Sequence, residues 1–287
     1  MCLFITLSYS VIRMNQLKLF IFLTFIVQTA HSQPVFEHLT TADGLSQSTV
    51  WEIVQDKKGF IWMATSDGLN RYDGYSFKVF RHEPEQKNSL PISNIAAVYA
   101  DRNSTIWVGP RNNGLCRLRA DGQTFDRFPL KTKEEPDGKV SISCFAERNN
   151  RLWIGTSEQG LFYYDYATQK VNQWEDTRIG KSVTSLLVDE RGVLWMGTNE
   201  GNLLSFVPET GVISVYNLPF SELVSARHRQ INVITKDNQG RFWVGTNGLG
   251  LFQFDLRQRI FFHELIKPGV YETVNIVFDV LNDKAGN

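Results

Sequence analysis

Short apolar stretches alternate with polar turns along the chain from about residue 34 onward. The first clear stretch is Val50–Asp56, which is followed by a turn ending at Gly59 and a second apolar stretch around Trp62. Apolar runs of this length, bounded by glycine and polar residues, are typical of strands in an all-β protein. A glycine at the turn permits the positive φ that tight hairpins need.

One phrase built around a tryptophan recurs five times, and its tryptophans lie 45, 46, 42 and 48 residues apart. A fixed period of this size indicates stacked units, each too small to bury its own apolar face. The phrase is centred on Trp62, Trp107, Trp153, Trp195 and Trp243. We interpret these five residues as structural, because a large aromatic side chain at one fixed place per repeat packs one unit against the next.

Each repeat reads as four strands: an apolar strand, the tryptophan strand after a turn, and two further strands. Four strands in roughly 45 residues make one blade of a β-propeller. The predicted blades span residues 45–82, 93–129, 140–174, 182–217 and 230–263, and a partial sixth spans 274–287. The sixth stops where its tryptophan is due, so we expect five complete repeats plus the start of a sixth. We also expect the sequence to be a fragment, or a prematurely terminated copy, of a longer protein.

The first strand of each repeat is predicted to be an inner strand, buried on both faces. Its recurring apolar positions lie twelve and nine residues before each tryptophan. These positions hold Val50 and Ile53, Ile95 and Val98, Ser141 and Cys144, Val183 and Leu186, and Ile231 and Ile234.

The N-terminus reads as a secretory signal. A basic start at Met14–Lys18 precedes an apolar run from Leu19 to Val27, and Ala30-His-Ser32 offers small residues for cleavage. The run is short for a membrane span. We therefore predict a signal peptide over residues 1–32, with Met14 as the better start, and an exported domain over 33–287.

Charge and cysteine content fit an exported domain. The chain has 30 basic and 30 acidic residues, with no lysine or arginine cluster of the kind a nucleic-acid binder needs. We therefore expect no nucleic-acid partner. Cys116 and Cys144 remain in the mature chain. Cys144 falls at a core position, which favours a buried free thiol and leaves a disulfide between neighbouring blades open.

The motifs that carry common chemistry are missing from the sequence. The histidines are scattered, no Cys-x-x-Cys pair occurs, and Gly245–Gly250 lacks the lysine that ends a phosphate-binding loop. The aspartates concentrate in turns, where their side chains bond nearby backbone. We therefore predict no catalytic residue, no metal site and no cofactor.

Several segments together resemble a known family. The opening Phe36–Ser48, the recurring Gly-x-Ile-Trp-x-x-Thr phrase and Gly68-Leu-Asn-Arg71-Tyr72-Asp73-Gly74 look like the start of a two-component regulator propeller. The resemblance covers about residues 34–287. It implies the periplasmic sensor part of a hybrid two-component system of the kind common in Bacteroidetes. Longer members continue into further propeller repeats, a membrane helix and a histidine kinase.

The resemblance implies the partners and the location of the protein. The remaining propeller and kinase parts of a full-length sensor would be its partners, the full-length protein would sit in the inner membrane, and its homodimer is a further candidate. Kinase activity is not expected in these residues, so we predict that this part of the protein is not an enzyme.

A sensor needs a binding face, and loops on a rigid scaffold are its usual place. In a blade, the loops from fourth to first strand and from second to third strand emerge on one edge. Polar planar groups there would suit saccharides rich in hydroxyl and carboxylate groups. The predicted ligand-binding residues are Asp67, Arg111, Asn112, Asn113, Arg227 and Arg229.

Three hypotheses follow from the sequence and the resemblance. The first is a periplasmic sensor that responds to a glycan-derived ligand such as an oligosaccharide. The second is an exported propeller enzyme, for example a lyase, that would use groups such as His228 or Arg229. The third is a scaffold for protein contacts alone.

Overall fold

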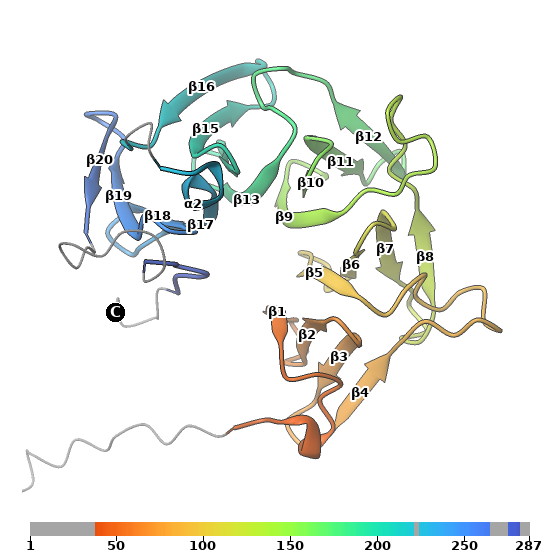
Figure 1. The fold of residues 1–287 in the computed structure, drawn as a ribbon. Coiled ribbons are helices and arrows are strands. Elements are labelled where there is room, and N and C mark those ends of the chain that lie inside the picture. The colour runs from red at the N-terminus through yellow and green to blue at the C-terminus, as the bar shows by residue number, and fades with distance from the viewer. Residues whose placement is uncertain (1–37, 221–223, 265–274, 282–287) are drawn as a thin grey trace, which may run out of the picture. The chain divides into compact units, whose positions relative to one another are not determined.

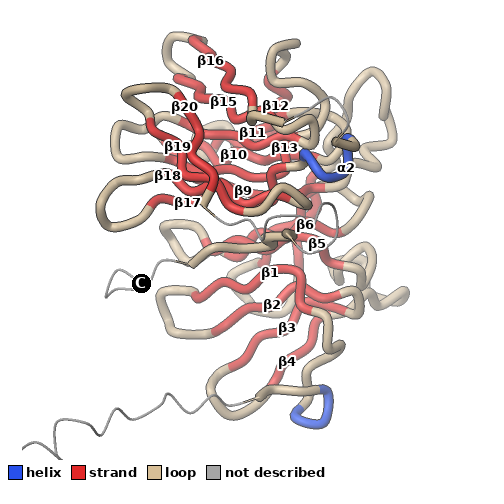
Figure 2. The backbone as a smooth tube through the Cα atoms, turned by 60° about the vertical axis from the view of Figure 1, so that its left-hand side comes forward, coloured by secondary structure: helices blue, strands red, loops and turns tan. Residues whose placement is uncertain are grey.

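The computed structural model describes residues 38–220, 224–264 and 275–281. Nearly all regular structure in these ranges is strand, with one short 3-10 helix, η1 (Thr41–Asp43), and one turn of α-helix, α2 (Ala226–Arg229) (Figure 2). The predicted signal peptide, residues 1–32, and the predicted turn at 282–287 lie outside the described residues. The strands all belong to one unit, Thr40–Asn287.

Twenty strands form five antiparallel sheets of four, each in chain order (Figure 1). The first holds β1 (Val50–Gln55), β2 (Ile61–Thr65), β3 (Gly68–Tyr72) and β4 (Phe77–Phe80). The second holds β5 (Ile95–Ala100), β6 (Ile106–Pro110), β7 (Leu115–Leu118) and β8 (Phe125–Phe128). The third holds β9 (Ile142–Arg148), β10 (Arg151–Thr156), β11 (Leu161–Asp165) and β12 (Lys170–Trp174). The fourth holds β13 (Val183–Val188), β14 (Leu194–Thr198), β15 (Asn202–Val207) and β16 (Val212–Asn217). The fifth holds β17 (Ile231–Lys236), β18 (Phe242–Thr246), β19 (Leu251–Asp255) and β20 (Ile260–His263).

The first strands of consecutive sheets contact one another, β1 with β5, β5 with β9, β9 with β13 and β13 with β17. These strands are the inner strands, as in the blades of a β-propeller. The prediction of an all-β chain built of four-stranded blades is confirmed. Side chains bind neighbouring inner strands directly: Ser185 Oγ accepts the backbone N–H of Ile234 at 3.0 Å, and Glu52 Oε2 accepts that of Val98 at 2.7 Å.

Each of the first four repeat tryptophans packs into a core shared with the next sheet. Trp62 lies with Val98 and Phe125 of the second sheet, and Trp195 lies with Ile231 of the fifth. Trp107 and Trp153 occupy the same place in the two cores between them. The core of the molecule is therefore a series of interfaces between consecutive sheets.

The inner strand of the first sheet departs from the expected burial. Ile53 is 60% exposed and Trp51 is 53% exposed, whereas Val98 in the same position of the second sheet is fully buried. One face of β1 packs toward β5, and the face that carries Trp51 and Ile53 is open to solvent. The prediction that every inner strand is buried on both faces is therefore wrong for this repeat.

The third repeat has a shorter hairpin between its first two strands. Trp153 pairs with Ala146, seven residues before it, whereas Trp62 pairs with Val54, eight residues before it. Counting back twelve and nine residues is therefore wrong by one here, and Ile142 and Phe145 hold the core positions that we assigned to Ser141 and Cys144.

Cys116 and Cys144 are buried free thiols. Burial raises the pKa of each thiol to about 12.

The described part of the predicted sixth repeat, residues 275–281, contacts the fifth sheet. It makes one isolated bridge, between Asn247 and Ile276, and the Val277 N–H donates to the Thr246 carbonyl at 2.9 Å. Residues 275–281 thus lie beside the fifth sheet, and Val277 lies against Gly245 as Ile231 lies against Gly197.

Candidate functional site

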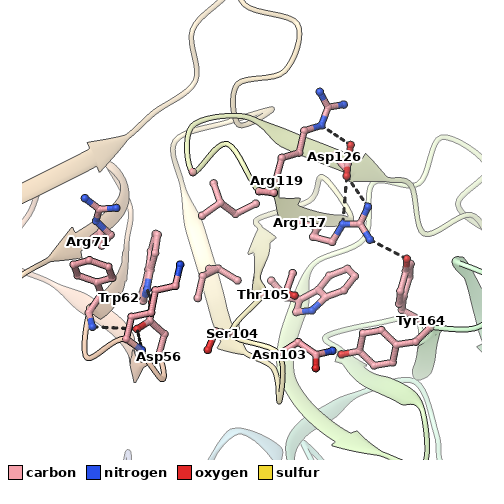
Figure 3. Close-up of a pocket in the computed structure, with 18 of the residues that line it drawn as sticks. Asp56, Trp62, Arg71, Asn103, Ser104, Thr105, Arg117, Arg119, Asp126 and Tyr164 are labelled. Carbon is pink, nitrogen blue, oxygen red and sulfur yellow. Dashed lines mark hydrogen bonds and ion pairs between the residues drawn. The ribbon is translucent and has the colours of Figure 1, made fainter.

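A cleft of about 660 Å³ lies between the first and second sheets, where several hairpin turns meet the third sheet (Figure 3). Its walls come from the β1–β2, β5–β6 and β7–β8 turns and from the end of β11. The charged and aromatic side chains that line it are Asp56, Lys58, Phe60, Trp62, Arg71, Trp107, Arg117, Arg119, Asp126, Tyr164 and Tyr166.

A buried aspartate fixes each of the two turns in the walls of the cleft. Asp56 Oδ1 accepts the backbone N–H groups of Lys58 and Phe60 at 2.9 and 3.1 Å. Its other oxygen accepts the indole N–H of Trp62 at 2.9 Å. Asp101 makes the equivalent bonds in the second sheet, with Trp107 at 2.9 Å. One carboxylate thus satisfies three donors, so both walls are held rigidly.

Two arginines of the cleft share one carboxylate. Arg117 pairs with Asp126 at 2.7 Å and Arg119 pairs with its other oxygen at 2.6 Å. Arg117 also donates to the Tyr164 hydroxyl at 3.2 Å. Burial acts to raise the pKa of Asp126, but the hydrogen bonds from the two guanidinium groups outweigh it and lower that pKa. Asp126 therefore stays ionised and orients both arginines.

Arg71 is placed differently. Its guanidinium lies 4.5 Å from the centre of the Phe60 ring. Its Nε is buried and has no hydrogen-bond partner. A buried donor without an acceptor is costly, and an acceptor brought by a ligand would remove that cost. Figure 3 shows Arg71 on the opposite side of the cleft from the Arg117–Asp126 pair.

The cleft combines positive charge with aromatic surface. Four basic side chains, Lys58, Arg71, Arg117 and Arg119, face two acidic ones, Asp56 and Asp126. The aromatic lining is Phe60, Trp62, Trp107, Tyr164 and Tyr166. Arginine suits carboxylate groups, and aromatic rings offer flat apolar surface. The arrangement can hold an anionic ligand with planar or ring-shaped parts.

The six ligand-binding residues predicted from the sequence lie on the other edge of the sheets. The cleft is lined by the turns between first and second and between third and fourth strands. The predicted residues lie instead in the β2–β3 and β6–β7 turns and in the loop before β17.

Four of these residues come from the first two sheets. Asp67 forms an exposed ion pair with Arg81 at 2.9 Å. The Arg111 guanidinium lies 5.7 Å from the centre of the exposed Trp51 ring. Asn112 adopts a φ of 55°, and the Asn113 amide donates to the Arg111 carbonyl at 3.0 Å. The two asparagines therefore shape the turn that presents Arg111 beside Trp51.

The other two lie in α2. The Arg229 guanidinium lies 4.4 Å from the Phe220 ring centre, and its Nε donates to the Val224 carbonyl at 2.8 Å. Arg227 is exposed, and its carbonyl accepts the Asn247 amide at 3.0 Å. A ligand role for any of the six stays a prediction.

The arginines of the cleft were not predicted from the sequence, although the chain carries a signal for them. Arg71 pairs across the sheet with Trp62, and Arg117 pairs with Trp107. At the same cross-strand place, the third to fifth repeats have Tyr163, Ser205 and Gln253. An arginine opposite the tryptophan is thus confined to the two repeats that form the cleft.

Within residues 38–220, 224–264 and 275–281, histidine, cysteine, aspartate and glutamate side chains nowhere gather in threes that could hold a metal ion. No helix within the same ranges has the length and apolar character needed to cross a membrane.

Comparison with known proteins relates the chain to signalling propellers. Residues 44–67, 177–200 and 226–248 match the family model described as two component regulator propeller. A stretch of 72 residues is 47% identical to a histidine kinase of Formosa agariphila and covers 25% of this chain and 5% of that protein. The chain thus spans a small part of the curated relative that it matches.

Among solved structures, the chain is similar to extracellular domains of putative two component systems. The extracellular domain of a putative hybrid two component system from B. thetaiotaomicron is 25% identical, with a TM-score of 0.66 over 79% of this chain and 31% of that chain. A second such domain from the same organism is 22% identical, with a TM-score of 0.56 over 85% of this chain and 37% of that chain. Virginiamycin B lyase from Staphylococcus aureus shares the fold alone. It is 14% identical, with a TM-score of 0.63 over 85% of this chain and 78% of that chain.

Proposed function

Because the chain carries repeats of the two-component regulator propeller family, we propose that it is the ligand-sensing part of a hybrid two-component signalling protein. It acts outside the cytoplasm, in the periplasm, after export by the segment 1–32. A histidine kinase elsewhere in the same protein converts ligand binding into a signal. The similarity to extracellular domains of such systems supports this placement.

We propose that the ligand is an acidic oligosaccharide, of the kind released by glycan breakdown, and that it binds in the cleft between the first two sheets. The observation that carries this proposal is the unpartnered, buried Nε of Arg71 beside a cleft in which basic side chains outnumber acidic ones. A carboxylate of the sugar would accept from Arg71. The rings of Phe60 and Tyr166 would contact the apolar faces of the sugar.

Isothermal titration of the purified chain tests this proposal. We expect heat of binding with tri-galacturonate and none with the neutral maltotriose. Arg71→Gln should weaken binding of the acidic sugar at least about tenfold, since hydrogen bonds to charged groups contribute about 1.5–3 kcal/mol. Arg241→Gln is the matched control, because Arg241 covers Trp243 of the fifth sheet on the same edge, at 5.3 Å, and lies outside the cleft.

Two results would contradict the proposal. The absence of binding across a broad panel of acidic and neutral oligosaccharides would remove the ligand class. Unchanged binding by the Arg71 variant, together with loss of binding in Arg111→Ala, would place the ligand on the loop edge that the sequence predicts.

A further inference from the structure

The hairpin between β9 and β10 lacks a feature that the other four repeats share. Arg148 pairs with Arg151, so the turn consists of Asn149 and Asn150 alone, and their φ values of 45° and 61° are both left-handed. Two such residues form the type I′ turn that closes tight hairpins, for which asparagine is well suited. In the first repeat, by contrast, residues 56–60 lie between the paired Gln55 and Ile61.

The longer turn supplies the aspartate that accepts the tryptophan N–H. The indole nitrogens of Trp62, Trp107, Trp195 and Trp243 donate to Asp56, Asp101, Asp189 and Asp237 at 2.9, 2.9, 3.0 and 2.9 Å. The third repeat offers Glu147 six residues before its tryptophan. This carboxylate instead accepts the Arg102 backbone N–H at 2.8 Å and pairs with the Arg102 guanidinium at 3.0 Å.

The indole of Trp153 is therefore left without an acceptor. Trp153 is 1% exposed, and its Nε1 is buried and makes no hydrogen bond. Arg148 Nη1 is a second buried donor without a partner, while Nη2 of the same side chain donates to Glu209 at 3.1 Å. Two unpaired donors in one shortened hairpin are a substantial cost unless an acceptor is supplied from outside.

A pocket of about 470 Å³ is present at this hairpin, between the third and fourth sheets. Its lining is Arg148, Asn149, Arg151, Trp153, Asp165, Pro208 and Glu209. Both residues with unpaired donors thus line one pocket. The β15–β16 turn closes it through Glu209, which also accepts the Asn149 amide.

We propose that this pocket binds a small carboxylate ligand, which takes the place of the missing aspartate. One carboxylate oxygen accepts from Trp153 Nε1 and from Arg148 Nη1. The ion pairs of the lining, Arg151 with Asp165 and Arg148 with Glu209, leave Arg148 Nη1 and Trp153 Nε1 without an acceptor. The site is separate from the cleft of the first two sheets, and it stands whether or not that cleft binds a sugar.

The test follows the tryptophan indole resonances of the ¹⁵N-labelled full chain during titration with sodium glucuronate, and with glucose as the neutral analogue. We expect a saturable shift of the Trp153 indole resonance with glucuronate and none with glucose. Arg148→Gln should weaken glucuronate binding at least about tenfold. Glu209→Gln should strengthen it, because it removes a carboxylate that competes for Arg148.

Two variants supply the controls. Trp195→Phe alters the equivalent tryptophan of the fourth repeat, whose indole is already bonded to Asp189, and should leave glucuronate binding unchanged. Replacing Asn149-Asn150 with the five residues Asp189–Val193 restores an aspartate and should abolish binding. A Trp153 resonance that glucuronate does not move, as expected if the pocket holds water only, would overturn the proposal. So would a shift that persists in the grafted hairpin.

Discussion

At the scale of single residues, one aspartate–tryptophan pair explains much of the repeat. The carboxylate of Asp189 accepts the backbone N–H groups of Arg191 and Val193 at 2.9 Å each and the indole of Trp195 at 3.0 Å. The turn and the core residue are therefore fixed together. The sequence predicts the turn aspartates and the buried tryptophans separately. It does not predict that they bond, because a spacing of six residues carries no information on side-chain direction.

The pair has a measurable energetic consequence. Trp195→Phe removes the donor and leaves the buried Asp189 oxygen unpaired, whereas Trp153→Phe removes a donor that has no partner. Both variants lose the same volume. We expect Trp195→Phe to lower the free energy of unfolding by about 1–3 kcal/mol more than Trp153→Phe. Urea denaturation of the two variants measures the difference, and equal losses would refute this reading of the pair.

Glu52 should make stability depend on pH. Burial raises the pKa of Glu52 from 4.5 to about 7. The hydrogen bond from the Val98 N–H opposes this rise, and the negative charge of Asp279 adds to it. The folded state therefore holds this proton more tightly than the unfolded chain, and stability falls as pH rises from 4.5 through 7.

Glu52→Gln should remove this fall. Since Glu52 is only half-buried, we expect the wild type to lose about 1–2 kcal/mol relative to the variant across this range. Denaturation curves at several pH values between about 4 and 8 provide the measurement. Parallel pH profiles for the two proteins would show that Glu52 titrates normally.

At the scale of the strand, close approach between sheets explains the glycine two residues after most of the tryptophans. A Cβ at Gly197 would lie 2.5 Å from Ile231 Cγ2, and one at Gly109 would lie 2.8 Å from Ile142 Cβ. The second strand of one sheet thus touches the inner strand of the next. The first repeat has Ala64 at this place, fully buried, so the interface between the first two sheets accommodates a methyl group.

Gly197→Ala tests this explanation. Its φ is not in the left-handed region, so the added methyl group acts through crowding of Ile231 alone. We expect a loss of about 1–3 kcal/mol in the free energy of unfolding. A neutral or stabilising effect in chemical denaturation would mean that the two sheets can separate slightly at no cost.

The strand pattern of the chain could be predicted because apolar periodicity and turn glycines are local signals. The shorter hairpin at Asn149-Asn150 could not, because it moves the register by only one residue and Trp153 keeps its place in the phrase. The cleft was missed for a different reason. Arg71, Arg117 and Tyr164 are far apart in sequence, and only the packing of three sheets brings them to one cavity. Loop residues such as Arg111 were easier to single out, since exposed polar groups in turns are visible in the sequence.

At the scale of the whole molecule, the repeats are similar in plan but unequal in environment. Ile53 and Val98 hold the same position of the inner strand, yet the first is largely exposed and the second is fully buried. The clefts between sheets differ as well, since arginines opposite the tryptophan occur only in the first two repeats. The repeated scaffold therefore presents clefts with different linings between different pairs of sheets.

The difference in burial between Ile53 and Val98 can be measured by replacing each residue with threonine. Ile53→Thr should change the free energy of unfolding by no more than about 0.5 kcal/mol, because the side chain is already exposed. Val98→Thr should cost about 1–3 kcal/mol, because it buries a hydroxyl in an apolar core. A large cost for Ile53→Thr would mean that the open face of β1 is covered in solution.

Hydrogen exchange with and without tri-galacturonate shows whether the cleft between the first two sheets receives an acidic sugar. We predict slower exchange at the β1–β2, β5–β6 and β7–β8 turns, around Lys58, Thr105 and Gly122, with the β2–β3 and β6–β7 turns unchanged. Protection confined to the turns around Asp67 and Asn112, or no protection at either edge, would mean that the sugar does not bind in this cleft.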